Sequence, residues 1–170
     1  GQRKRIAVIV IIDTAARVFG IVIIYLAACQ RHRAVGFDTA AVTDMDSMFY
    51  GCISLRSLDI SSFSTENVED MGWMFYRCST LTGLDLAHFH TGSVRDMNAM
   101  FSGCAGLTRL DISGFDTANV TDMGAMFSGC CNLKTLEVSH FNTANVTNLS
   151  AMFRDCSGLA ELDVSNFDTR

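Results

Sequence analysis

The chain of 170 residues contains no proline, one tryptophan and seven cysteines. A chain that lacks proline and still turns many times favours short connections copied from one template. The cysteines are too few and too regularly spaced for a disulfide-rich small domain. There is no glycine-rich phosphate-binding loop, and no nucleophile, base and orienting acid can be assembled from the spacing. The sequence therefore predicts no enzyme, no cofactor and no metal site.

What the chain does contain is a 26-residue unit that repeats without a slip. Each unit starts with phenylalanine and carries a Met-Phe pair three residues before a cysteine. Such a period predicts stacked units that bury their apolar sides against one another. Five complete units and the start of a sixth form a repeat region over 37–170, with unit bounds at 37–62, 63–88, 89–114, 115–140 and 141–166.

The charge is divided unevenly between the two parts of the chain. Residues 1–36 carry six Lys and Arg against one acid, or +5, whereas residues 37–170 carry seven basic and seventeen acidic residues, or −10. An acidic repeat region repels the phosphate backbone. We therefore expect no nucleic-acid partner.

Residues 1–36 do not match the repeat and form a separate hydrophobic segment with three possible interpretations. The first is an export signal, in which a basic start precedes an apolar run from Val18 to Ala28. The four residues that end at Cys29, Leu-Ala-Ala-Cys, resemble the lipobox of bacterial lipoproteins. Under this interpretation Cys29 is a candidate lipidation site and tethers the protein to a membrane.

The other two interpretations of this segment are a membrane anchor and a cap. Residues 6–28 are long enough to span a bilayer. Asp13 and Arg17 count against a span, because each charge costs roughly 2.5–3.5 kcal/mol near the centre of a membrane helix. As a cap, the β-branched runs would instead form strands that cover the first coil.

Each unit divides into a leucine-rich half and a Met-Phe half. In the first copy, the spacing Leu55-x-x-Leu58-x-Ile60 predicts a short strand with the aliphatic side chains inward and Asp59 outward. In the fourth copy, four apolar residues recur at i, i+3, i+4 and i+7, as on one face of an α-helix: Met123, Met126, Phe127 and Cys130. The prediction is an α/β repeat solenoid with a parallel sheet on one face and short helices on the other.

Two apolar columns follow from the repeat. We expect the first phenylalanine of each unit to stack on the next one, in the series Phe37, Phe63, Phe89, Phe115, Phe141 and Phe167. We expect the periodic cysteines to be buried free thiols, because each unit offers only one thiol and inter-coil spacing on the helical side disfavours disulfides. These are Cys52, Cys78, Cys104, Cys130 and Cys156.

The outward strand positions form the candidate binding surface. Stacking predicts a column of carboxylates about 4.8 Å apart, whose neighbours repel one another. Either solvent and nearby basic side chains offset the repulsion, or cations or a basic partner dock there. The candidate residues are Arg56, Asp59, Thr82, Asp85, Arg109, Asp111, Lys134, Glu137, Glu161 and Asp163. They would line a concave sheet face that binds a protein, or a glycan.

The units FSTENVEDMGWMFYRCSTLTGLDLAH and FDTANVTDMGAMFSGCCNLKTLEVSH resemble the BspA-type leucine-rich repeats of bacterial surface proteins. The resemblance covers residues 37–170 and implies a leucine-rich-repeat fold. It also implies an exported or surface-anchored protein, because members are typically of that kind, some are lipoproteins, and several bind host proteins or neighbouring cells. We therefore expect a membrane-tethered surface module for protein binding or adhesion. The alternatives are a structural spacer of a larger surface protein and an intracellular interaction scaffold.

Overall fold

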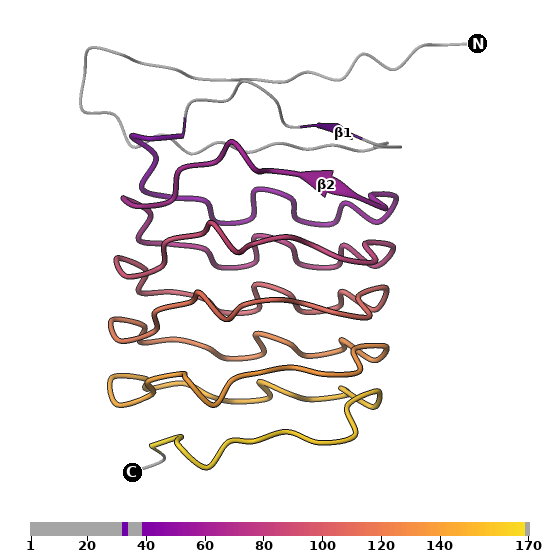
Figure 1. The fold of residues 1–170 in the computed structure, drawn as a ribbon, viewed down its shortest axis with the longest axis vertical. Helices are drawn as coiled ribbons and strands as arrows, with labels where there is room; N and C mark the ends of the chain where they lie inside the picture. The colour runs from indigo at the N-terminus through magenta and orange to yellow at the C-terminus, as the bar shows by residue number, and fades with distance from the viewer. Residues whose placement is uncertain (1–31, 34–38, 169–170) are drawn as a thin grey trace.

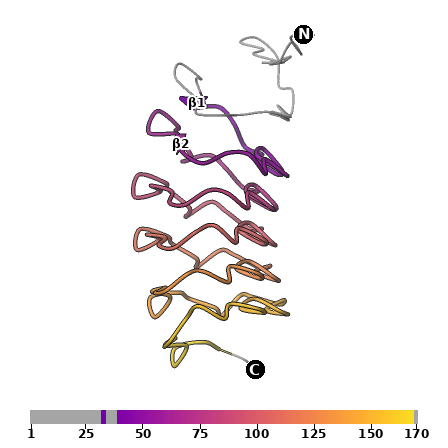
Figure 2. The same ribbon diagram turned by 90° about the vertical axis from the view of Figure 1, so that its right-hand side faces the viewer.

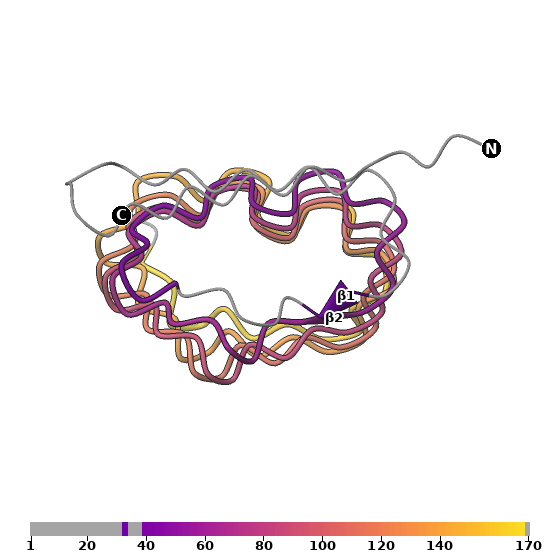
Figure 3. The same cartoon turned by 90° about the horizontal axis from the view of Figure 1, so that it is seen from above.

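The chain winds into a stack of coils. The structure, a computed structural model, describes residues 32–33 and 39–168. Each 26-residue unit makes one coil, and successive coils lie above one another along the long axis (Figures 1 and 2). Viewed from above, the coils superpose around one elongated outline (Figure 3). The repeat in the sequence is therefore also the repeat in space.

Backbone hydrogen bonds join each coil to the next. In the Met-Phe half, every second N–H group donates to a carbonyl one coil further along the stack. In the second unit these bonds are 2.7–3.0 Å long and run from Met71 to Asp96, Trp73 to Asn98, Phe75 to Met100 and Arg77 to Ser102. The units before and after repeat the pattern. These bonds provide partners for backbone groups that would otherwise be buried without one.

Regular strand is very short in the described part of the chain. Strand β1 (His32–Arg33) pairs in parallel with β2 (Leu58–Asp59), with His32 opposite Leu58. Further pairing consists of isolated parallel bridges one period apart, namely Asp44 with Asp70, Asp70 with Asp96, Asp85 with Asp111, Asp96 with Asp122, and Asp122 with Asn148. The pairing of β1 shows that the coil register reaches His32–Arg33, which the sequence assigned to the N-terminal segment.

The predicted α/β leucine-rich-repeat solenoid is wrong. Residues 39–168 contain no helix, and the only strands in the described residues are β1 and β2, of two residues each. The expected sheet on one face is reduced to this pair and the bridge between Asp85 and Asp111. The alternation of side chains is nevertheless as predicted at that bridge, where Leu110 and Ile112 are buried and Asp111 is exposed.

Consecutive tight turns stand where the helices were predicted. In the fourth unit, Ala125 and Gly129 have left-handed φ values of 54° and 75°, which an α-helix does not allow. The N–H groups of Met126 and Cys130 donate to carbonyls three residues earlier, not four. Met123, Met126, Phe127 and Cys130 are all fully buried. The apolar spacing therefore identified the inward residues correctly, but not the backbone that carries them.

The rings that stack through the core come from the Met-Phe pairs. Successive ring centroids of Phe49, Phe75, Phe101, Phe127 and Phe153 are 5.4–5.8 Å apart, with interplanar angles of 4–6°. The phenylalanines expected to stack, such as Phe89 and Phe115, are buried but do not form this column. That prediction therefore had the wrong residue of each unit.

Buried threonines connect neighbouring coils at the start of each unit. Thr117 is 2% exposed, and its Oγ1 donates to the carbonyl of Asn142 at 3.0 Å and accepts from the N–H of Asn142 at 2.8 Å. Thr39 bonds in the same two ways to the backbone of Ser64, and Thr65 to the backbone of His90, each in the next coil. The threonine of the Phe-x-Thr sequence is thus a staple between coils.

Four of the five periodic cysteines are buried free thiols, as predicted. Cys52, Cys78, Cys104 and Cys130 are buried free thiols, whereas Cys156 is partly exposed. The Sγ of Cys104 donates to the carbonyl of Phe75 at 3.0 Å. Burial raises the pKa of the Cys104 thiol to about 12. The thiol therefore stays protonated at neutral pH and is a poor nucleophile.

The proposed anchor at residues 6–28 lies outside the described residues. Within the described part of the chain, no helix has the length and apolar character needed to cross a membrane.

Candidate functional site

The predicted binding residues lie on one side of the stack, which we call the candidate binding face. Its acidic column occupies one repeat position, where Asp59 is partly buried and Asp85, Asp111, Glu137 and Asp163 are exposed. The other predicted residues occupy two adjacent columns. Arg56, Thr82 and Lys134 share the first, and Arg109 and Glu161 share the second.

A shallow hollow of about 1090 Å³ lies in the middle of this face. Five of the ten predicted residues line it, namely Thr82, Asp85, Arg109, Asp111 and Glu137. Leu84 and Leu110 contribute apolar walls. Arg56, Asp59, Lys134, Glu161 and Asp163 lie outside the hollow. The structure therefore brings three carboxylates and one guanidinium together around a depression that spans several coils.

Local hydrogen bonds stabilise the carboxylates of this face. Asp111 Oδ1 accepts from Ser113 Oγ at 2.7 Å and from the Ser113 N–H at 3.1 Å. These bonds hold the pKa of Asp111 below its ordinary value. Bonds from Ser165 lower the pKa of Asp163 in the same way. At Asp111 and Asp163, the serine two residues after the acid is thus the partner that stabilises the negative charge.

A second acidic column was missed by sequence reasoning. It consists of Asp44, Asp70, Asp96 and Asp122 with Asn148 as its last described member, and we call it the aspartate ladder. Each side-chain Oδ1 accepts from the N–H two residues further on, as Asp96 does from Asn98 at 2.7 Å. The sequence signal was the aspartate that precedes Met45, Met71, Met97 and Met123.

The environment of the ladder changes along the stack. Burial raises the pKa of Asp70 and Asp96, and the charges of neighbouring aspartates raise each pKa further. Burial also acts on Asp122, but hydrogen bonds outweigh it and hold the pKa of Asp122 below its ordinary value. Asn148 Nδ2 supplies two of these bonds, at 3.0 Å to each carboxylate oxygen. An amide in the next coil thus relieves the repulsion that a carboxylate would cause.

Asp46 adds another carboxylate beside the ladder. Its Oδ1 is buried and, among the described residues, has no hydrogen-bond partner, and burial raises the pKa of Asp46. A Cβ at Gly72 would lie 3.2 Å from this oxygen and 3.1 Å from Asp70 Oδ1. Glycine at 72 therefore leaves room for two carboxylates that would otherwise be pushed aside.

The substitution Asp96→Asn is expected to stabilise the protein by roughly 0.5–1.5 kcal/mol at neutral pH, the net value of one hydrogen bond. The raised pKa means that folded Asp96 binds protons more readily than unfolded Asp96. The contribution of Asp96 to the free energy of unfolding is thus most favourable below the pKa that Asp96 has in the unfolded chain. It is lost as the pH rises through the higher pKa of Asp96 in the folded chain. The gain from asparagine should therefore shrink on acidification, which urea unfolding at neutral pH and near pH 4 would measure.

The reverse substitution is the matched control for this prediction. Asn148→Asp should destabilise the protein at neutral pH, because it replaces two hydrogen bonds to Asp122 by charge repulsion. A stability gain from Asp96→Asn that is the same at both pH values would show that ladder repulsion is not its cause.

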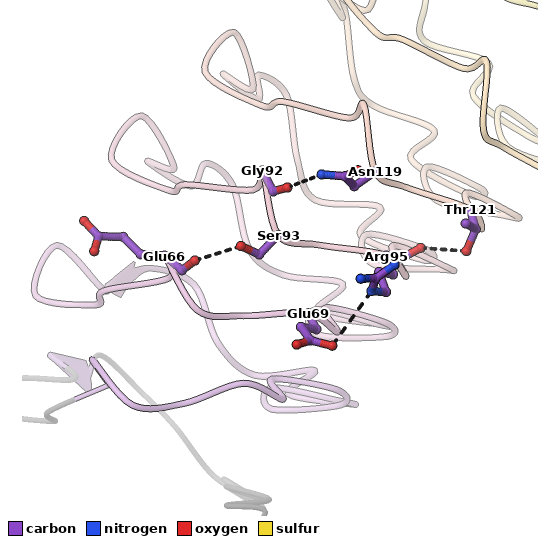
Figure 4. Close-up of polar contacts among 7 residues, drawn as sticks. All are labelled: Glu66, Glu69, Gly92, Ser93, Arg95, Asn119 and Thr121. Carbon is purple, nitrogen blue, oxygen red and sulfur yellow. Dashed lines mark hydrogen bonds and ion pairs between the residues drawn. The ribbon is translucent and has the colours of Figure 1, made fainter.

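The side of the stack near Glu69 is held by side chains that reach across coils (Figure 4). Asn119 Nδ2 donates to the Gly92 carbonyl at 2.7 Å, and Thr121 Oγ1 donates to the Arg95 carbonyl at 3.1 Å. The ion pair between Arg95 Nε and Glu69 Oε2 is 3.8 Å long and about two-thirds exposed on both sides. An exposed pair of this length adds little stability. These contacts connect neighbouring coils.

In the described residues, no group of three or more His, Cys, Asp or Glu has the arrangement of a metal site. The candidate lipidation residue Cys29 lies outside these residues.

Two overlapping segments of the chain, residues 26–109 and 106–170, match one family model, described as "Mycoplasma protein of unknown function, DUF285". The match shows two tandem segments of one repeat-containing family. It does not identify the BspA-type repeat itself. No curated protein and no solved structure matches the chain.

Proposed function

The chain belongs to the DUF285 family of Mycoplasma proteins of unknown function, and we propose that it is a cell-surface module for protein binding or adhesion. The finer likeness to BspA-type repeats supports this proposal, because several proteins of that type bind host proteins or neighbouring cells. The candidate binding face would be presented to a protein on such a cell. A glycan is the second type of ligand that this face could take.

The observation that carries the proposal is the hollow on the candidate binding face. Its carboxylates Asp85, Asp111 and Glu137 are exposed, and they stand on coils joined by backbone hydrogen bonds. A rigid scaffold limits the entropy lost when a partner binds. Three acids beside Arg109 favour a partner with a mainly basic surface, since complementary charges speed and orient association.

Neutralising the hollow is expected to weaken cell attachment by about tenfold, equivalent to about 1.4 kcal/mol. The variant combines Asp85→Asn, Asp111→Asn and Glu137→Gln. Beads that carry the purified chain would be incubated with cultured animal cells, and the bound beads would be counted at several chain densities. Thermal unfolding of the variant would verify that its coils still form.

A matched control removes three charges elsewhere. Glu66→Gln, Glu69→Gln and Asp116→Asn change the net charge equally, and Asn142 already occupies the position of Asp116 in the next unit. The control should attach as the unaltered chain does. Equal attachment by the two triple variants and the unaltered chain would favour the spacer over the binding module.

We place the protein on the outer surface, tethered through its N-terminal segment. The Leu-Ala-Ala-Cys sequence that ends at Cys29 and the likeness to surface proteins support this location. An intracellular scaffold is the alternative if residues 1–36 act as a cap.

Lipid labelling tests the tether directly. Full-length chain expressed in a bacterium with a radioactive fatty acid should carry label in the membrane fraction, and Cys29→Ala should abolish the label. Unlabelled protein in the membrane fraction would indicate a spanning anchor instead. Unlabelled protein in the soluble fraction would contradict the surface location.

A further inference from the structure

Four residues in the first two described coils break the pattern of the repeat, and we call them the aromatic patch. They are Tyr50, Trp73, Tyr76 and Arg77. Tyr50 is 44% exposed and Trp73 is 38% exposed, Tyr76 is partly exposed and Arg77 is exposed. In the next two units the same positions carry small residues, which are Ser102 and Ser128, Ala99 and Ala125, and Gly103 and Gly129. The coil therefore forms without these large side chains.

Contacts within the aromatic patch join three of its side chains, those of Tyr50, Tyr76 and Arg77. The rings of Tyr50 and Tyr76 stack with centroids 4.7 Å apart and an interplanar angle of 20°. The Arg77 guanidinium lies 5.4 Å from the centroid of the Tyr76 ring. The N–H of Tyr76 donates to the Trp73 carbonyl at 2.9 Å, so Trp73 and Tyr76 belong to one tight turn of the backbone. The side chains of Tyr50, Tyr76 and Arg77 therefore support one another before any partner binds.

The backbone of the patch is unfavourable for the residues it carries. Trp73 and Arg77 have φ values of 49° and 57°, a left-handed conformation that disfavours large side chains. At the position of Arg77, three of the other four described units have glycine, at Gly51, Gly103 and Gly129. The left-handed backbone belongs to the repeat, since Ser47, Ala99, Ala125 and Ala151 share it with Trp73. What is particular to the patch is the large side chain on that backbone.

The residue types indicate a protein partner. Trp, Tyr and Arg are enriched at the centres of protein interfaces, whereas Ser and Ala are depleted there. Exposed aromatic rings favour proline-rich segments, which adopt the preformed polyproline II conformation and lose little entropy on docking. The guanidinium of Arg77 favours a carboxylate. The 170 residues contain no proline, so they do not supply this segment themselves.

We propose that the aromatic patch binds an extended, proline-rich and acidic segment of another protein. This inference goes beyond the proposed function, which concerns the candidate binding face. The two surfaces select opposite charges, because the acids of the binding face repel an acidic segment. A failure at one surface is therefore distinguishable from a failure at the other.

The protein contains its own probe, because Trp73 is the single tryptophan. The full chain would be titrated with a synthetic peptide of Glu-Pro-Pro repeats while Trp73 fluorescence is recorded. Polyproline II has three residues per turn, so the glutamates fall on one side of the peptide. We expect a saturable blue shift with a Kd below about 1 mM. Peptides of Lys-Pro-Pro and Glu-Gly-Ser repeats should bind at least about fivefold more weakly, which separates charge from proline content.

Two substitutions keep the probe and alter the patch. Tyr76→Ser should weaken binding of the Glu-Pro-Pro peptide by about tenfold, and Arg77→Gly should remove the preference for glutamate over lysine. Both introduce residues found at the same positions in the neighbouring units, Ser102 and Gly103, so thermal unfolding should show an intact stack. The triple variant of the candidate binding face should bind this peptide unchanged.

Several outcomes would overturn the proposal. One is the absence of a fluorescence change at millimolar Glu-Pro-Pro peptide, and another is equal binding of the three peptides. Parallel titrations use phosphatidylcholine vesicles and an oligosaccharide of N-acetylglucosamine. A change with vesicles but not with the peptide would indicate a membrane-contact surface, and a change with the oligosaccharide alone would indicate a glycan site.

Discussion

Replacing Phe101 by alanine is expected to lower the free energy of unfolding by about 3–5 kcal/mol. The ring is fully buried and stacks between Phe75 at 5.6 Å and Phe127 at 5.7 Å. Alanine would leave a cavity in the middle of the ring column and remove two ring contacts. Because each coil is stabilised by its neighbours, the defect weakens the coils on both sides. Urea unfolding followed by circular dichroism measures the loss.

Phe101→Leu is the control for this substitution. Leucine keeps most of the buried apolar volume but removes the parallel ring stacking, so its cost should be smaller, about 1–2 kcal/mol. A cost of Phe101→Ala no larger than that of Phe101→Leu would mean that the ring column is not a principal source of stability.

Thr117→Val is expected to destabilise the protein by about 1–3 kcal/mol. Valine has nearly the shape of threonine but cannot replace the hydroxyl, which both donates to and accepts from the backbone of Asn142. The substitution leaves a carbonyl and an N–H of the next coil without their partner. Thermal unfolding and amide hydrogen exchange around Asn142 would measure the global and the local loss.

An exposed threonine provides the comparison. Thr121 is exposed, and its Oγ1 donates to the Arg95 carbonyl at 3.1 Å. At the surface, water can replace the hydroxyl as the donor to this carbonyl. Thr121→Val should therefore change stability by less than about 0.5 kcal/mol. Similar losses from Thr117→Val and Thr121→Val would show that the buried staple has no special role.

The sequence predicted which residues point inward far better than it predicted the backbone. The spacing of Met123, Met126, Phe127 and Cys130 indicated one apolar face, and all four are buried. A helix is the usual way to bring i, i+3, i+4 and i+7 together. Consecutive tight turns with left-handed residues at Ala125 and Gly129 achieve the same burial. Apolar spacing alone does not distinguish these two backbones.

The candidate binding face was partly predictable and the aspartate ladder was not. Alternation of Leu110, Asp111 and Ile112 placed the acid outward, and the structure places it in the hollow. Asp96 lacked this alternation, and its position before Met97 gave no indication of its environment, which depends on the aspartates one coil before and after it. The same holds for the aromatic patch, where the stacking of Tyr50 on Tyr76 joins residues of different units.

The sequence by itself determined the 26-residue coil, its inward residues and the family to which the chain belongs. These properties follow from periodicity, since a unit that cannot bury its apolar side alone must stack on a copy of itself. Only the tertiary structure decided how the backbone of each coil runs. In this stack the N–H of Ala125 donates to the carbonyl of Ser150 in the next coil. Once alternate N–H groups bond to the next coil, a helix can no longer form.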